Sequence, residues 1–445
     1  SIAFNQQPWF SIGCGDWALT IGSGGLFAEA QDGFSGNFYI ANTSTGKAVI
    51  GANQTWSMNA TATKSTQFDA SAIIDLNGKT LNCNVTNTTG DTFYNYDMKF
   101  SGKLKGSGTI EKRGTTGALV ITGANNHTEF SGTVSVIEGV LALYSGPTMD
   151  GGSVDVGATG TLKVENGNAS IGSLAGSGSA NISDGYTLTT GAKGNNSEFS
   201  GAITSSSGAG TYLVKTGAGT FTISGNNAAT HLCSTTVSQG TLSVTGDISG
   251  SIVTVNSGAT IQGNGTVKEL VLDGQVSPGL SPGTLNVAQH SSWNGGGSYL
   301  WEINDATGVA GTNWDLLNVG WQLNINANSG NTFTVALKSL TAGNVEGACP
   351  NFTDTNASWK IATAGTWVNG FDVSDFTIDA TQFKAQNPSA TGVFSIEQAN
   401  WDGSNYHDIN ITYTQAVPEP SSVAFFALGI LGLVGVGMKR MKAAR

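Results

Sequence analysis

Charged residues and proline are both scarce in this chain of 445 residues. Asp, Glu, Lys and Arg make up only 11% of it, whereas about 25% is usual for a soluble domain. The 8 prolines are too few for a Pro-rich linker or a collagen-like helix. The charges that are present give a formal net charge of −11. Because an acidic surface repels phosphate groups, the composition excludes nucleic acid as a partner.

Cysteine is rare as well, and its spacing excludes two kinds of site. The four residues Cys14, Cys83, Cys233 and Cys349 lie far apart and form no C-x-x-C pair. The sequence therefore encodes neither a zinc site of the usual spacing nor a thioredoxin-like redox motif. In an oxidising compartment four cysteines allow three disulfide pairings, and buried free thiols are the alternative.

Glycine, in contrast, is abundant, with 63 residues against an average usage of about 7%. It is mixed with Ser, Thr and Asn and with short runs of Val, Ile and Leu. Short β-branched runs between turn-forming residues are typical of β-strands. No long stretch before the C-terminal tail has the spacing of an amphipathic helix. The composition therefore predicts an all-β fold.

Two segments of the chain repeat each other. Residues 106–126 read GSGTIEKRGTTGALVITGANN, and residues 208–227 read GAGTYLVKTGAGTFTISGNN. Four glycines match at an offset of 102 residues, and a weaker third copy lies between them at residues 174–203. Self-similarity of this kind predicts a solenoid, in which each repeat packs on its neighbours.

Within each copy, short apolar runs such as Leu119–Ile121 and Phe221–Ile223 lie between glycines. Glycine permits the positive φ of a sharp corner, and small Asn and Ser side chains also suit corners. A chain that turns every few residues and stacks strand on strand forms a parallel β-helix with inward Val, Ile and Leu. A β-sandwich is the rival fold, but sandwiches seldom show sequence self-similarity, so we predict the β-helix.

The repeated pattern carries a family resemblance. GSGT-x-x-K-x-G, then G-x-L-x-I-x-G-x-N, then S-x-G-x-L resembles the autotransporter-associated β-strand repeat of bacterial surface proteins, over roughly residues 104–266. The segment SPGLSPGTLNV, residues 277–287, resembles the C-terminal end of such passenger domains. The resemblance implies a right-handed parallel β-helix. No long run of outer-membrane barrel strands follows, so we expect that the protein does not secrete itself.

Tryptophan indicates how the chain is organised, because none of the ten lies between Trp56 and Trp293. Thin rungs have little room for indole, whereas the ends of a solenoid need bulk to cover the core. We therefore expect an N-terminal cap or first rungs at 1–56, the β-helix at 57–287 and a closing C-terminal β region at 288–415. Burial of the indoles is the favoured interpretation, and stacking of exposed indoles on sugar rings is the alternative.

One catalytic motif occurs in the sequence, but it lacks a hydrogen-bond donor that the reaction needs. Residues 279–283 read GLSPG and match the G-x-S-x-G turn of α/β hydrolases. In that turn the residue after the serine donates its backbone N–H to the oxyanion. Here Pro282 follows Ser281 and has no N–H, so we predict that Ser281 is not a nucleophile.

Other catalytic and cofactor sites are not predicted. Carboxylates in the middle of the chain are scattered in sequence, at Asp155, Glu165, Asp184, Glu198 and Asp247. The four histidines have no metal-binding spacing, and no phosphate-binding or calcium-binding glycine loop occurs. These histidines are His127, His231, His290 and His407. His127 and His231 fall near equivalent corners of their repeats, which favours a structural role. We predict no cofactor, no metal site and no enzymatic activity.

The tail combines an apolar run with a basic end. Val423–Met438 is free of charge and would span about 24 Å as a helix, close to the ~30 Å hydrocarbon core once flanking residues are included. We predict a single transmembrane helix there. Its basic residues would hold the C-terminus in the cytoplasm and place the body outside. These residues are Lys439, Arg440, Lys442 and Arg445. Because the chain starts at Ser1 rather than Met, we also expect that a signal peptide has been removed.

Pro418, Glu419 and Pro420 precede this run. A Pro-Glu-Pro motif, an apolar helix and terminal basic residues, in that order, resemble the PEP-CTERM sorting signal, which we place at 416–445. The resemblance implies processing by an exosortase, a transient stay in the inner membrane and a Gram-negative bacterium that makes extracellular polysaccharide.

The predicted function is that of an exported, non-enzymatic β-solenoid of the bacterial envelope, cell surface or extracellular matrix, structural or adhesive. Its expected partners are the exosortase and the inner membrane, with extracellular polysaccharide as a further candidate. The alternative is a carbohydrate-binding or polysaccharide-cleaving β-helix.

Overall fold

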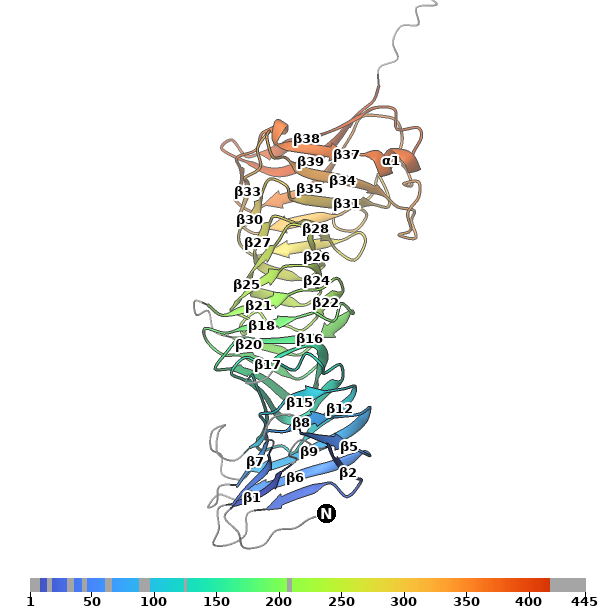
Figure 1. Cartoon of the computed structure of the whole chain (residues 1–445). Helices are drawn as coiled ribbons and strands as arrows, with labels where there is room; N and C mark the ends of the chain where they lie inside the picture. The colour runs from blue at the N-terminus through green and yellow to red at the C-terminus, as the bar shows by residue number, and fades with distance from the viewer. Residues whose placement is uncertain are drawn as a thin grey trace, which may run out of the picture.

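A computed structural model describes residues 9–13, 18–29, 36–41, 46–60, 66–87, 97–123, 126–205 and 210–416. These residues form one elongated stack of β-strands (Figure 1). All strand pairs from β1 to β37 are parallel. The predicted all-β solenoid is therefore confirmed for the described residues, and a β-sandwich is excluded for them.

The strands form three ladders, and each turn of the chain visits ladders 1, 2 and 3 in that order. Ladder 1 contains β1 (Trp9–Gly13), β4 (Gly36–Ala41), β7 (Thr66–Ala70), β10 (Met98–Phe100), β13 (Ala118–Thr122), β17 (Ser179–Ile182), β20 (Ala202–Ser205), β29 (Thr284–Val287), β32 (Leu316–Val319) and β35 (Ala357–Ala364).

Ladder 2 follows ladder 1 along each turn. It contains β2 (Ala18–Ile21), β5 (Lys47–Ile50), β8 (Ile73–Asp75), β11 (Leu104–Lys105), β18 (Thr187–Thr190), β21 (Tyr212–Lys215), β23 (Ser234–Val237), β30 (Ser291–Trp293), β33 (Gln322–Ile325) and β36 (Trp367–Asn369).

Ladder 3 completes each turn. It contains β3 (Leu26–Glu29), β6 (Gln54–Ala60), β9 (Lys79–Asn87), β12 (Gly108–Arg113), β19 (Ser197–Phe199), β22 (Thr220–Ile223), β24 (Gly240–Val244), β26 (Ala259–Gly263), β28 (Gln275–Pro278), β31 (Ser298–Ile303), β34 (Phe333–Ser339) and β37 (Phe376–Asp379).

Five longer strands bend through a corner and pair in more than one ladder. They are β14 (Thr133–Tyr144), β15 (Thr148–Glu165), β16 (Ala169–Gly176), β25 (Asp247–Val255) and β27 (Thr266–Leu272). Because these strands run through corners without interruption, they join most strands of the three ladders into one 35-stranded sheet, whereas β2, β5, β8 and β11 of ladder 2 form a separate four-stranded sheet.

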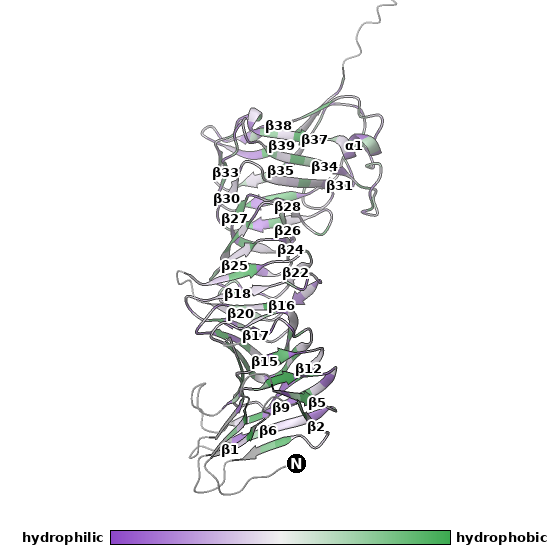
Figure 2. Ribbon diagram, viewed as in Figure 1, coloured by the Kyte–Doolittle hydropathy of each residue, from purple (hydrophilic) through white to green (hydrophobic). Residues whose placement is uncertain are grey.

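Side chains alternate between the interior and solvent along most strands, and the hydropathy of the residues changes along single strands (Figure 2). In β26, for example, Ala259 and Ile261 are buried, whereas Thr260 and Gln262 are partly exposed. Period-2 alternation is what a strand with one buried face requires. The interior is one continuous apolar core from Ile21 to Tyr413.

A column of glycines marks the corner between ladders 3 and 1. If Gly201 carried a Cβ atom, that atom would lie 1.9 Å from the carbonyl oxygen of Gly178 in the preceding turn. Gly225 meets the oxygen of Gly201 at 2.5 Å in the same way, and Gly246 meets that of Gly225 at 2.1 Å. Successive turns therefore approach so closely at this corner that only glycine fits.

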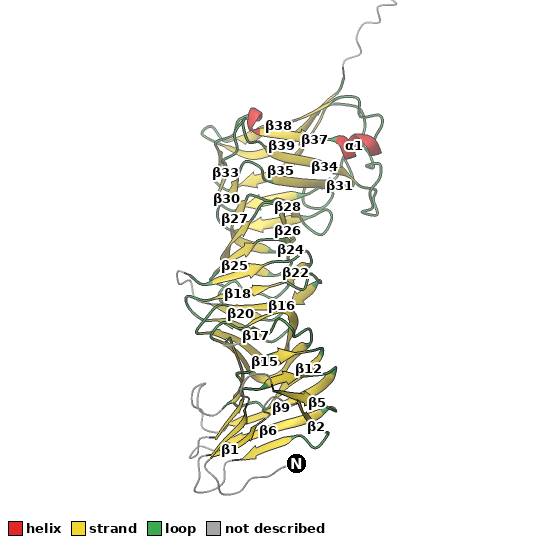
Figure 3. Cartoon of the chain, viewed as in Figure 1, coloured by secondary structure: helices red, strands yellow, loops and turns green. Residues whose placement is uncertain are grey.

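The C-terminal end differs from the rest of the stack. The strands β38 (Val393–Trp401) and β39 (Tyr406–Thr414) form an antiparallel hairpin, and β39 pairs antiparallel with β35. The short helix α1 (Thr381–Gln386) and a 3₁₀ turn (Val373–Asp375) lie at this end (Figure 3). The Phe383 ring packs edge-to-face on Phe394, with ring centroids 5.0 Å apart. The hairpin and α1 thus bury further aromatic rings at the end of the core.

Eight of the tryptophans have described side chains, and they divide into two groups. Burial, the favoured prediction, is confirmed for five of them, which are Trp56, Trp293, Trp301, Trp314 and Trp359. It is wrong for the three exposed indoles of Trp321, Trp367 and Trp401. The physical reason is that these three lie at a corner or hairpin end or on an outward strand position.

The sequence predicts a transmembrane helix at Val423–Met438, and that segment lies outside the described residues. Within the described part of the chain, no helix has the length and apolar character needed to cross a membrane.

Candidate functional site

Each of the two clear repeats contains a fully buried lysine, which sequence reasoning did not single out. The Lys215 ammonium donates hydrogen bonds to the carbonyl oxygens of Thr216 at 2.8 Å, Gly217 at 2.7 Å and Gln239 at 3.0 Å. Burial lowers the pKa of Lys215 to about 8. The ammonium therefore satisfies three carbonyl groups of the backbone corner that follows β21 and of the next turn.

Lys112 closes a corner of the same kind in the first repeat. Its ammonium donates to the carbonyl oxygens of Arg113 and Gly114, both at 2.7 Å, and to that of Glu138 at 3.4 Å. Burial lowers its pKa to about 8, although nearby Cys83, Glu138 and Asp97 act in the opposite direction. The shared K-x-G of the two copies is therefore a corner-closing device.

The two lysine corners lie on different sides of the solenoid. Lys112 belongs to β12 in ladder 3, whereas Lys215 belongs to β21 in ladder 2. The offset of about 102 residues is thus not a whole number of turns. The repeat is a local module of strand, corner and strand that forms at whichever corner the chain has reached.

His127 fills a position that an asparagine occupies in the second repeat. Its Nδ1 accepts the backbone N–H of Leu104 at 2.9 Å, and its Nε2 lies 3.0 Å from the carbonyl oxygen of Thr122. Asn227 likewise accepts the N–H of Ile203 at 2.7 Å. Both groups satisfy a buried strand amide of the preceding turn, and burial lowers the pKa of His127.

His231 is therefore not the equivalent of His127, although both lie at corners. His231 forms a single β-bridge with Ser205, as Phe130 does with Gly106. The imidazole of the second repeat therefore occupies the position of the Phe130 ring in the first repeat. Its Nε2 lies 3.0 Å from the hydroxyl of Thr235, and burial lowers its pKa to about 4. Both histidines serve the packing of the core.

Ser281 lies in a tight turn between β28 and β29, with a φ of +85°. Gly279 exchanges both backbone hydrogen bonds with Gly263, at 2.8 and 3.0 Å, and Gly283 donates its N–H to the Asp315 carboxylate at 2.8 Å. These backbone amides are engaged in the turn. The statement that Ser281 is not a nucleophile stays a prediction.

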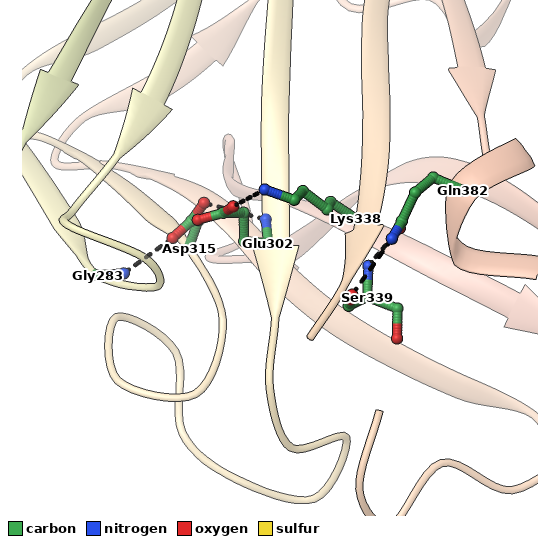
Figure 4. A network of polar contacts seen from close by, with 6 residues as sticks. All are labelled: Gly283, Glu302, Asp315, Lys338, Ser339 and Gln382. Carbon is green, nitrogen blue, oxygen red and sulfur yellow. Dashed lines mark hydrogen bonds and ion pairs between the residues drawn. The ribbon is translucent and has the colours of Figure 1, made fainter. Parts of the chain in front are cut away.

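A buried acidic group holds this turn in place (Figure 4). Asp315 has no exposed surface, and it also accepts the N–H of Glu302 at 3.0 Å. Burial raises the pKa of Asp315 well above its ordinary value, and the Glu302 charge acts in the same direction. Glu302 pairs with Lys338 at 2.8 Å and is itself buried. Both carboxyl groups are therefore largely shielded from solvent.

The scattered carboxylates of the middle region are not brought together. Asp155 and Glu165 lie on β15 in ladders 3 and 1, and Asp184 lies beyond β17. Glu198 accepts the Ser224 hydroxyl at 2.6 Å. Asp247, at the start of β25, accepts the N–H of residue 249 at 2.8 Å. No group of three His, Cys, Asp or Glu side chains within reach of one metal ion occurs among the described residues.

The described cysteines are buried free thiols, which is one of the two alternatives that the sequence leaves open. They are Cys83, Cys233 and Cys349, while Cys14 lies outside the described residues. Burial raises the pKa of all three, that of Cys349 to about 12. A thiol with a raised pKa is a weak nucleophile at neutral pH.

Two open hollows occur on the surface of the stack. One has a volume of about 530 Å³ and is lined by hydroxyl and amide groups of β17, β20 and the adjoining turns, with Asp184 as its acid. The other, of about 240 Å³, is lined by Gly, Ala, Thr, Gln and Ser residues near β26, β28 and β31. Neither lining contains the pair of acidic or basic groups that general acid–base catalysis needs.

Three exposed indoles, an exposed tyrosine and the half-buried ring of a histidine lie at one corner of the last turns, which we call the aromatic corner. It comprises His290, Trp321, Trp367, Trp401 and Tyr406. The three indoles expose 53%, 40% and 55% of their surface, respectively. Trp321 packs edge-to-face on His290 with ring centroids 5.3 Å apart, and Trp401 lies 4.8 Å from Tyr406.

Backbone pairing fixes how these residues lie relative to one another. The carbonyl oxygen of Trp321 accepts the N–H of Thr366 at 2.9 Å, so Trp321 and Trp367 lie on neighbouring turns. His407 attaches the hairpin end to the same corner, because its Nδ1 lies 3.2 Å from the Ala364 oxygen and its Nε2 lies 2.8 Å from the Asp402 carboxylate.

Amide side chains continue from this corner along the outward face of ladder 2, and we call them the amide row. The row comprises Gln322 and Asn324 of β33, Asn369 of β36, Asn326 and Asn294. Asn369 donates to Asn324 at 3.3 Å, and Asn326 donates to Asn294 at 3.0 Å. Trp367 projects from the same side of β36 as Asn369, because buried Val368 separates them.

The predicted sorting residues Pro418, Glu419 and Pro420 lie outside the described residues. The same holds for the basic residues of the tail, which are Lys439, Arg440, Lys442 and Arg445.

Comparison with protein families finds two matches. The Passenger-associated-transport-repeat matches residues 110–143 and 213–244, which are the two lysine-corner modules. The PEP-CTERM protein-sorting motif matches residues 416–440.

Two curated proteins are similar to parts of the chain. The Extracellular serine protease of Serratia marcescens is 39% identical over 95 residues, which are 21% of this chain and 9% of the protease. The Adhesin BmaC autotransporter of Brucella suis biovar 1 (strain 1330) is 35% identical over 151 residues, which are 33% of this chain and 4% of the adhesin. The chain spans less than a tenth of either relative. The chain thus carries a PEP-CTERM protein-sorting motif and passenger-associated transport repeats, which indicate an exported protein of the cell envelope and surface.

Proposed function

We propose that this protein is a non-enzymatic structural or adhesive solenoid of the bacterial surface or extracellular matrix. The observation that carries the proposal is the continuous parallel stack, whose outward side chains form neutral hydrogen-bonding rows. Asn181 donates to Thr204 at 3.0 Å, and Asn318 donates to Asn286 at 2.9 Å. A long, weakly charged surface of amides and hydroxyls suits contact with other surface polymers.

The similarity to an autotransporter adhesin supports the adhesive side of this proposal. The matched region lies within a protein named as an adhesin, and the matching repeat is the module that builds the corners of this solenoid. By the same family resemblance we propose that the solenoid is right-handed. We also propose the division into 1–56, 57–287, 288–415 and 416–445.

The tail has a separate role in the proposal. Pro418, Glu419 and Pro420 would present an extended site to an exosortase-type enzyme in the inner membrane, because proline disfavours helix and strand. Val423–Met438 would hold the chain in that membrane until processing. The basic residues would keep the end inside. They are Lys439, Arg440, Lys442 and Arg445.

Surface proteomics of the producing cell tests the export and sorting. We expect protease treatment of intact cells to release peptides of residues 97–416 and none from Ala424–Lys439. The Pro418→Ala, Pro420→Ala double variant should accumulate uncleaved in the inner membrane with a normally folded body. Surface protein that retains the tail would make a permanent anchor the better account, and protein confined to the cytoplasm would overturn the proposal.

Carbohydrate binding is the second candidate function, and the exposed indoles of the aromatic corner favour it. Cleavage of polysaccharide has less support, because the close acidic pair Glu302 and Asp315 is buried and engaged with backbone and Lys338.

A further inference from the structure

We propose that the aromatic corner and the amide row form a binding site for a neutral polysaccharide, which they contact through the faces and hydroxyl groups of its pyranose rings. The proposal rests on the adhesive function proposed above and assigns it a site and a class of ligand.

The first support is the concentration of exposed indoles. Trp293 and Trp301 are fully buried two turns or less from this corner. The core of these turns can therefore hold indoles, so exposure of the other three is not forced by a lack of space inside. Single exposed aromatic residues are ordinary, but three indoles and a tyrosine at one corner form a cluster. Clustered exposed apolar groups mark interaction sites. Tryptophan and tyrosine also contribute most strongly per residue to binding.

The second support is that the backbone that carries Trp321 and Trp401 is held before any ligand arrives. Trp321 donates its N–H to Gln289 at 3.0 Å and accepts that of Thr366 at 2.9 Å, so hydrogen bonds on both sides fix its backbone. The Trp401 hairpin end is held by His407 between Asp402 and Ala364. Rings on a fixed backbone lose little entropy when a ligand binds.

The third support is the chemistry between the rings. An asparagine side chain offers two donors and an acceptor with two lone pairs. The contacts within the amide row, together with the bond that Asn294 donates to Asp273 at 2.8 Å, use only part of that capacity. An apolar partner such as a lipid tail would bury these amides without hydrogen bonds, which is costly. A sugar ring presents a flat C–H face for the indoles and hydroxyl groups for the amides, so it matches both parts of the surface.

The charge of the surface selects a neutral ligand. The outward residues of β33 and β36 are Gln322, Asn324, Trp367 and Asn369, and none of them is charged. The ionic groups that border the surface are of both signs. Asp402 pairs with His407 at 2.8 Å, Asp273 accepts a hydrogen bond from Asn294 at 2.8 Å, and Lys268 and Glu269 lie side by side on the turn before His290. A chain with a net charge of −11 repels an anionic polymer, and the described residues of this corner include no basic cluster that would compensate.

The test uses the purified full chain and immobilised cellohexaose, chitohexaose and mannohexaose as neutral probes, with oligogalacturonate as the anionic probe. We expect at least one neutral probe to bind and oligogalacturonate not to bind. The Trp321→Ala, Trp367→Ala double variant should lose affinity by about tenfold or more. The Trp321→Phe, Trp367→Phe variant, which keeps flat rings, should retain more of it. Tyr212→Ala is the matched control, because Tyr212 is an exposed aromatic residue of β21 far from the corner, and its loss should leave affinity unchanged.

The proposal is overturned if no neutral probe binds, or if the Trp321→Ala, Trp367→Ala double variant binds like the wild type. It is also overturned if the Trp variants lose only self-association in sedimentation, since the corner would then be a contact between two copies of the chain. Failure of the surface function gives a different result, because it appears in surface proteomics and leaves glycan binding by the purified chain unaffected.

Discussion

The middle turns and the last turns of this solenoid solve the same packing problem with different side chains. Around Gly178, Gly201 and Gly225, successive turns approach so closely that a Cβ atom would meet the backbone of the preceding turn. From β30 onward the interior holds Trp293, Tyr299 and other large rings, and the exposed surface carries three indoles.

The difference indicates a division of labour within one stack. The middle turns use glycine and a buried lysine to repeat a narrow corner, which makes them a regular spacer. The last turns bury tryptophan and tyrosine rings where the middle turns bury smaller rings such as those of Phe199 and Phe221, and they expose indoles outside. In line with the binding site proposed above, we propose that the repeats act as support and that ligand contact occurs at the C-terminal end.

The largest effect should come from the glycine column. Gly201→Val would place a branched side chain against the Gly178 oxygen, where even a Cβ atom would lie at 1.9 Å. We expect it to cost more than about 4 kcal/mol of unfolding free energy, measured by denaturant unfolding with circular dichroism. Gly22→Ala is the control, because nothing lies within 4 Å of its Cβ position. A Gly201→Val protein of normal stability would refute the close approach.

A smaller effect should follow from loss of a lysine corner. Lys215→Met would leave the carbonyl oxygens of Thr216, Gly217 and Gln239 without their shared donor, at a cost of about 2–4 kcal/mol. Lys112→Met should behave alike if the corners are equivalent. Exposed Lys193→Met should change stability by less than about 0.5 kcal/mol. Unequal costs at the two buried lysines would break the equivalence.

The same corner predicts a pH dependence. The pKa of Lys215 is lowered from 10.5 to about 8 in the fold, so between these values the unfolded chain binds more protons than the folded chain. Stability should therefore rise with pH from about 8 to 10.5, by about 1–3 kcal/mol, and Lys215 should contribute no slope below pH 8. The difference between wild type and Lys215→Met across this range isolates the effect, and a parallel pair of curves would contradict it.

The smallest effect on stability should come from the aromatic corner. Because Trp321 and Trp367 are largely exposed, their replacement by Ala should change the free energy of unfolding by less than about 1 kcal/mol. Trp301→Ala is the contrast, since that indole is buried and donates to the Asp315 carbonyl at 3.1 Å, and its loss should cost about 3–5 kcal/mol. Equal costs would show that the exposed indoles are structural.

The sequence predicts the stack of strands, but it does not predict that the two repeats place their lysine corners in different ladders. The matched glycines of residues 106–126 and 208–227 indicate repetition, and parallel pairing follows. They do not reveal how many residues make one turn, because turns vary in length at loops and corners. That is why the ladder of Lys112 and the ladder of Lys215 could be assigned only from the structure.

The candidate site was harder to predict for two physical reasons. A lysine in K-x-G looks like a surface residue, since charged side chains are rarely buried without partners, and its partners here are backbone oxygens. Trp321 lies two residues before buried Leu323 and four before buried Ile325, so the alternation of a strand predicts an inward ring. The corner before β33 interrupts this alternation, and the ring points outward. For Trp367, by contrast, the alternation with Val368 indicates an outward ring.

The most direct measurement of this division of labour is hydrogen–deuterium exchange of the full chain with and without cellohexaose, chitohexaose or mannohexaose. We predict added protection at residues 320–326, 365–369 and 400–407, with the repeats at 110–143 and 213–244 unchanged. Protection in the repeats, with none at the C-terminal corner, would contradict the assignment of ligand contact to the last turns.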